Sequence, residues 1–142
     1  MKFKLAILSA GAGVLLAALP ALAHHSFAAE FDVSKPITLK GKFVRMDWVN
    51  PHSHILLDVT DADGKVVTWS FEALPPNVLF RQGWRKDVLK PGEEIEVEGF
   101  QAKDGSANAW TRSVKTAEGR RLFAGSPDAL PPGAPPAPKD DK

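Results

Sequence analysis

The sequence contains no cysteine. This absence excludes disulfides, a lipoprotein anchor, thiol catalysis and thiolate metal sites. The chain also lacks an excess of charge of one sign, because 18 basic and 17 acidic side chains give a net charge of +1. Proteins that bind nucleic acid are normally distinctly basic, so the composition argues against that class as well.

Recognisable catalytic motifs are also missing. No serine or threonine stands in a nucleophile-elbow motif, and no two carboxylates occupy positions that can be argued to converge. We therefore expect a protein that is not an enzyme.

The N-terminal apolar run, from Leu5 to Leu19, is shorter than the roughly 20 residues of a membrane span. Lys2 and Lys4 precede this run, and Ala21-Leu22-Ala23 follows it as a signal-peptidase site. We expect a signal peptide at residues 1–23, a mature periplasmic chain that starts at His24, and no membrane contact after cleavage. The alternative is an uncleaved membrane anchor.

The C-terminal segment differs in composition from the rest of the chain. Residues 126–142, "SPDALPPGAPPAPKDDK", hold half of the 12 prolines and end in charged residues. This composition is typical of a disordered or polyproline-like tail. The folded domain is therefore expected at residues 24–125, with a modest core that no disulfide supports.

Hydrophobic periodicity in this domain is mostly that of strands. In residues 37–49 the apolar positions change parity beside Gly41, where a bulge would bend a long strand. The stretch "HILLDVTDADGKVVTWSFE" predicts two strands joined by a turn at residues 61–64. Pro75 and Pro76 begin a run of one or two helical turns that ends at Gly83.

The second half of the domain predicts further strands around turns at Pro91-Gly92 and at residues 103–106, with a short last strand at residues 121–123. This order predicts an all-β fold, a small five- to six-stranded OB-like Greek-key barrel with one short helix between strands 3 and 4. A β-sandwich is the competing architecture. The residues expected in the core are Leu57, Val59, Trp69, Phe71, Ile95 and Val97.

In an OB barrel, ligands bind on strands 2 and 3, between the loops that join strands 1 to 2 and 4 to 5. In this chain those loops are "NPHSH", residues 50–54, and "AKDGS", residues 102–106. The expected ligand face comprises Trp48, Asn50, Trp69, Asp104 and Ser106. Its tryptophans serve either as half-buried cover or as a stacking platform for a flat ligand.

Histidines form the candidate metal site. His52 and His54 are two residues apart, so in an extended chain both imidazoles project to one side. A mature N-terminal His24, followed by His25, adds an α-amine and an imidazole that can chelate one ion. Nitrogen ligands suit copper(II), and also zinc and nickel. Copper is therefore the expected metal, and the alternative is that all four histidines are simply solvated.

A basic cluster follows the predicted helix. Arg81, Arg85, Lys86 and Lys90 surround Trp84, with Asp87 as the one acidic residue among them. Such a cluster can hold an acidic protein partner. Its alternative interpretation is a solvated helix end.

Four stretches, "HHSFAAEFD", "WVNPHSH", "ALPPNVLFRQGWRKDVLKPGEEIEVEGF" and "AKDGS", resemble in this order the motifs of an exported bacterial family, domain of unknown function 6152 (DUF6152). The resemblance covers about residues 24–125, and it implies a small periplasmic β-barrel protein without an assigned activity. His54 departs from the family pattern, which implies that His24, His25 and His52 are the better ligands. The matching residues are His24, His25, Ser26, Phe27, Trp48, Asn50, Pro51, His52, Asn77, Gly83, Trp84, Leu89, Pro91 and Gly92.

Three functional hypotheses follow from these observations. The first is a non-catalytic periplasmic binding protein that holds a metal ion, preferably copper, between the mature N-terminus and the "NPHSH" loop. The second is a protein-interaction module that docks a periplasmic partner through a strand edge and residues 81–90. A copper-dependent oxidative enzyme is the third.

Overall fold

The computed structural model describes residues 29–125. Its elements are, in chain order, β1 (Phe31–Asp47), β2 (Ser53–Thr60), β3 (Val66–Ala73), α3 (Pro76–Arg81), β4 (Glu94–Ala102), β5 (Asn108–Thr116) and β6 (Arg121–Phe123). The predicted signal peptide, His24, His25 and the proline-rich tail lie outside the described residues. Within residues 29–125, no helix has both the length and the apolar character needed to cross a membrane.

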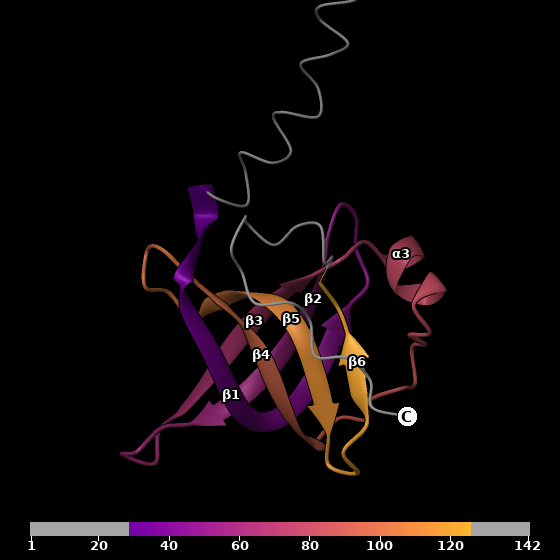
Figure 1. The fold of residues 1–142 in the computed structure, drawn as a ribbon. Helices are drawn as coiled ribbons and strands as arrows, with labels where there is room; N and C mark the ends of the chain where they lie inside the picture. The colour runs from indigo at the N-terminus through magenta and orange to yellow at the C-terminus, as the bar shows by residue number, and fades with distance from the viewer. Residues whose placement is uncertain (1–28, 126–142) are drawn as a thin grey trace, which may run out of the picture.

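The six strands form one sheet in the order β3-β2-β1-β4-β5-β6. Sequential neighbours in this order are antiparallel. β3 also pairs with β5 in parallel through three residue pairs, from Ser70↔Asn108 to Glu72↔Trp110. The sheet therefore curls into a barrel-like ring, as Figure 1 shows. This order confirms the OB-like architecture with a short helix after the third strand, and it contradicts a sandwich of two sheets.

The core lies inside the ring and follows the period-two pattern of the strands. Leu57, Phe71, Ile95 and Val97 are at most 1% exposed, as predicted. Val59 and Trp69 are partly buried and pack against this core. The alternation therefore identifies the inward face correctly, and burial becomes incomplete toward the hairpin that joins β2 to β3.

The turns also lie where their residues predict them. The carboxylate of Asp61 accepts hydrogen bonds from the backbone N–H groups of Asp63 and Lys65, at 3.0 and 2.8 Å. Gly64 completes this hairpin with a positive φ of 81°, a conformation that glycine adopts without strain. α3 has proline at its start and is followed by Gly83 with a φ of 92°.

One expectation in β1 is wrong, because the bulge does not lie beside Gly41. The register between β1 and β2 shifts between Phe43 and Arg45. Phe43 keeps the inward direction and is only 5% exposed. Gly41 has a different role, since a Cβ at this position would overlap the carbonyl oxygen of Asp58 on β2. The glycine therefore lets the backbones of β1 and β2 approach closely.

We predict that Gly41→Ala destabilises the domain by about 2 kcal/mol or more, because the added methyl group meets backbone that cannot move independently. Gly64→Asn is the matched control, since open space surrounds Gly64 and asparagine tolerates its positive φ. Urea unfolding of both variants measures the difference. A Gly41→Ala variant as stable as the control would contradict the close approach of these strands.

Candidate functional site

The candidate site begins with a contact between the imidazole of His52 and the carboxylate of Glu72. His52 stands in the loop after β1, one residue before β2, and its Nδ1 lies within hydrogen-bond reach of Oε1 of Glu72 on β3. The side chain of Glu72 is 17% exposed and that of His52 is 36% exposed. Glu72 points outward because its neighbours Phe71 and Ala73 are fully buried on the inner face. The pair is thus on the outer surface of the ring.

Trp110 of β5 forms the third part of the site. The rings of His52 and Trp110 meet edge to face, with centroids 5.4 Å apart and planes at 89°. Trp110 is 6% exposed and also packs against Phe31, at a centroid distance of 5.9 Å. The register partner of Glu72 across the parallel β3–β5 pairing is Trp110. The pairing that closes the ring is therefore also what assembles the site.

His54 shares the outward direction of His52 but has its own partner. Ser53 between them is fully buried, as are Ile55 and Leu57, so both histidines point away from the core as predicted. Nδ1 of His54 lies 3.4 Å from the hydroxyl oxygen of Ser70 on β3. The structure therefore connects His52 to a carboxylate and His54 to a hydroxyl group.

The expected ligand face is not gathered in one place. Trp48 stacks on Phe80 of α3, with ring centroids 5.0 Å apart and planes at 4°. Trp69 packs against the buried Phe71, at 6.1 Å, so it is on the opposite face of β3 from Glu72. Asn50 is exposed in the β1–β2 loop. Of these residues, Asn50 is the one nearest in sequence to His52.

Asp104 and Ser106 bind each other in the loop between β4 and β5. The carboxylate of Asp104 accepts hydrogen bonds from the hydroxyl group and the backbone N–H of Ser106, at 2.6 and 2.9 Å. These two bonds lower the pKa of the Asp104 carboxyl below its usual value, and the bond from the hydroxyl group has the larger effect. The side-chain amide of Asn108 donates to the Ser106 hydroxyl at 3.0 Å. The loop is thus held in shape by its own side chains.

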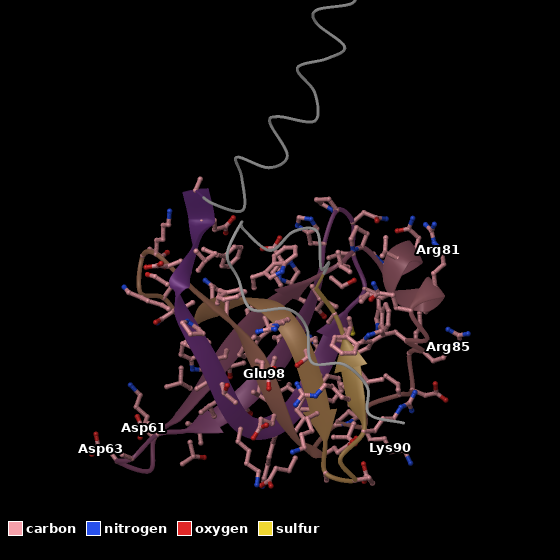
Figure 2. The ribbon with its side chains drawn as sticks, in the orientation of Figure 1. Asp61, Asp63, Arg81, Arg85, Lys90 and Glu98 are labelled. Atoms are coloured by element: carbon pink, nitrogen blue, oxygen red, sulfur yellow. The ribbon has the colours of Figure 1, made fainter. Side chains whose placement is uncertain are left out.

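The predicted partner-binding cluster divides into surface residues and a buried one. Arg81, Arg85 and Lys86 are exposed, and Figure 2 shows Arg81, Arg85 and Lys90 along the side of the molecule where α3 lies. Trp84 is instead fully buried, and its Nε1 donates a 2.7 Å hydrogen bond to the carbonyl oxygen of Phe123 on β6. A partner cannot contact Trp84 directly, so its expected role is corrected to that of an internal support.

Sequence reasoning missed Glu72. In "TWSFE" this carboxylate is on the polar side of an alternating strand and looks like ordinary solvated surface. The available signal was the hairpin register, which sets Glu72 opposite His54 and close to the "NPHSH" loop. In the part of the chain that the structure describes, no three His, Cys, Asp or Glu side chains gather in a way that could hold a metal ion.

Comparison with known proteins identifies a family. The model of a Family of unknown function (DUF6152) matches residues 12–111, more than two thirds of the chain. No curated protein and no solved structure matches the chain.

Proposed function

Since the chain belongs to the Family of unknown function (DUF6152), whose description names no activity, we propose a function from the site itself. The protein is a non-catalytic periplasmic binding protein, and its ligand is a metal ion, with copper(II) as the best-suited metal. His52 is the ligand that the barrel supplies, and the mature N-terminus at His24 supplies the others. The observation that carries the proposal is the contact between Nδ1 of His52 and the carboxylate of Glu72.

The contact with Glu72 determines which ring nitrogen of His52 is available. With Nδ1 directed at Glu72, Nε2 is the nitrogen that can bind a metal ion. Metal-binding histidines commonly donate their other ring N–H to a carboxylate, which orients the ring and makes it a stronger ligand. The edge of the ring against Trp110 further limits its rotation. His52 is thus held as a preorganised single ligand, while His54 beside Ser70 is not paired with a carboxylate.

The remaining ligands come from the N-terminus in this proposal. A chain that begins at His24 offers its α-amine and its imidazole to the same ion, and His25 follows directly. The α-amine and the imidazole of His24, together with Nε2 of His52, are three nitrogen donors. This set favours copper(II) in a tetragonal arrangement. β1 begins at Phe31, and Phe31 packs against Trp110, which also contacts His52. The chain therefore enters the barrel beside the proposed site.

We predict that His52→Ala weakens copper(II) binding at least tenfold, about 1.4 kcal/mol, in protein whose first residue is His24. Mass spectrometry of the intact protein establishes that N-terminus. One residue added before His24 should weaken binding by a similar factor, because it removes the amine–imidazole chelate but keeps every histidine. Competition with a copper-binding dye measures both affinities.

Two further variants locate the ligand within the barrel. Glu72→Gln keeps the size of the side chain but removes the carboxylate, and we expect it to weaken binding by about tenfold through loss of the support to His52. His54→Ala is the matched control and should change the affinity less than threefold. Equal copper(II) affinities for the parent, the extended protein and His52→Ala would overturn the proposal. These histidines would then be solvated side chains that bind no metal ion.

A further inference from the structure

We propose that a surface on α3 and its two flanking loops docks an acidic segment of a partner protein, and that this segment also carries an aromatic or large aliphatic side chain. The surface, called here the α3 surface, consists of Trp48, Val49, Phe80, Arg81, Arg85, Lys86 and Lys90. None of these residues belongs to the His52–Glu72 pair, and the proposal does not depend on metal binding.

The apolar part of the α3 surface is exposed and rigidly supported. Val49 is 50% exposed and Phe80 is 37% exposed. Phe80 stacks on Trp48, and Trp48 meets the buried Trp84 edge to face at 6.5 Å. The exposed ring of Phe80 therefore rests on Trp48, which Trp84 supports in turn, and it can receive an apolar side chain with little loss of its own conformational freedom.

Within residues 29–125, the cations around this apolar part form no ion pair with a carboxylate. The ion pairs found there involve other basic side chains, at Lys35, Lys40, Arg45 and Arg121. Arg81, Arg85, Lys86 and Lys90 are all exposed. The carboxylates of the β2–β3 hairpin, Asp61 and Asp63, lie at the other side of the molecule (Figure 2). Within residues 81–90 Asp87 is the one acidic residue beside four basic ones, so an acidic partner would meet an excess of positive charge.

Two arginines are held in place by the backbone, which favours a protein partner over a lipid surface. Nε of Arg81 donates to the carbonyl oxygen of Asn77 at 3.1 Å. Nη1 of Arg85 donates to the carbonyl oxygens of Phe80 and Trp84, at 3.0 and 2.6 Å. Their remaining N–H groups are free to pair with carboxylates at defined positions. Lipid headgroups move freely in the plane of a membrane, so arginines at fixed positions would bind them little better than mobile ones.

The sheet edges are poorer docking sites than the α3 surface. β6 has only three residues. The first half of β1 pairs with β4 alone from Pro36 to Gly41, and Pro36 there lacks the N–H that an added strand would need. The partner is therefore expected at the α3 surface.

Binding to random copolymers of glutamate and tyrosine (4:1) tests the proposal, with pure polyglutamate as the second probe. The full-length mature protein should bind the tyrosine-containing polymer more tightly in bio-layer interferometry. The double variant Arg81→Glu/Arg85→Glu should weaken binding of both polymers at least tenfold. Phe80→Ala should remove the preference for tyrosine and leave the affinity for polyglutamate unchanged within about twofold.

The matched control is Lys65→Glu/Lys115→Glu, which makes the same change of charge at exposed positions on other elements, the β2–β3 hairpin and β5. We expect this control to weaken binding less than threefold, and circular dichroism checks that every variant is folded. Equal losses in both double variants would overturn the proposal, since net charge alone would then explain binding. Binding to vesicles of phosphatidylglycerol and phosphatidylcholine (3:7) without binding to either polymer would also overturn it, in favour of a membrane surface.

Discussion

Val97→Asp is expected to destabilise the domain by about 3–5 kcal/mol, because it leaves an unpaired charge in the core. Val97 is fully buried on β4. Its register partners are Leu39 on β1 and Val114 on β5, so both of its cross-strand neighbours are apolar. A small domain has only about 5–15 kcal/mol of stability in total. The variant should therefore lose much of its resistance to urea, or fail to fold at 37 °C.

Val66→Asp is the matched control for this change. Val66 is also a strand valine, on β3, but it is 56% exposed. The same substitution there should cost less than about 1 kcal/mol, since the carboxylate stays in water. Equal midpoints of urea unfolding for the two variants would show that the inward face of β4 is assigned incorrectly.

Trp84→Ala is the second substitution with a large expected effect, about 3–5 kcal/mol. The indole is fully buried and contacts Trp48. Its Nε1–H group also bonds the backbone of β6 at Phe123. Removing it opens a cavity between the segment after α3 and the sheet, so the loss of packing adds to the loss of the hydrogen bond.

Two variants separate these contributions and distinguish Trp84 from a surface residue. Trp84→Phe keeps most of the ring volume but leaves the Phe123 carbonyl without this donor, which should cost about 1–3 kcal/mol. Phe80→Ala removes an aromatic ring that is 37% exposed and should cost less than Trp84→Ala. If thermal unfolding placed Trp84→Ala within 2 °C of the parent, the role of internal support would be contradicted.

Local residue patterns were sufficient to predict the elements and their order. Alternation at Ile55, Leu57, Ile95 and Val97 identifies the inward face, because side chains of a strand alternate between its two faces whatever the strand pairs with. The hairpin turn at residues 61–64 follows from the capacity of Asp61 to bond its own backbone and of glycine to adopt a positive φ. These are properties of a few adjacent residues, so the sequence carries them directly.

The position of the β1 bulge shows where local patterns become insufficient. A glycine and a change of parity both indicated Gly41, but the register shifts between Phe43 and Arg45. The register of β1 depends on β4 along its first half and on β2 along its second half. A glycine is needed at position 41 for a different reason, since the carbonyl group of Asp58 on β2 leaves no room for a Cβ there. Two strands from different parts of the chain decide this detail together, and no single window of sequence contains both.

The candidate site divides in the same way. The alternation of residues is enough to predict that His52 and His54 face away from the core, because Ser53, Ile55 and Leu57 occupy the alternate positions. The contacts of His52 with Glu72, 20 positions further along, and with Trp110 depend instead on how the strands pair.

The burial of Trp84 was likewise decided by tertiary structure. Its exposed neighbour Arg85 and the nearby Lys86 indicate surface, and it is β6, almost forty residues later, that accepts its hydrogen bond. Direction along a strand is a local property of the backbone. Contact between strands depends on how the whole ring closes, at the parallel pairing of β3 with β5.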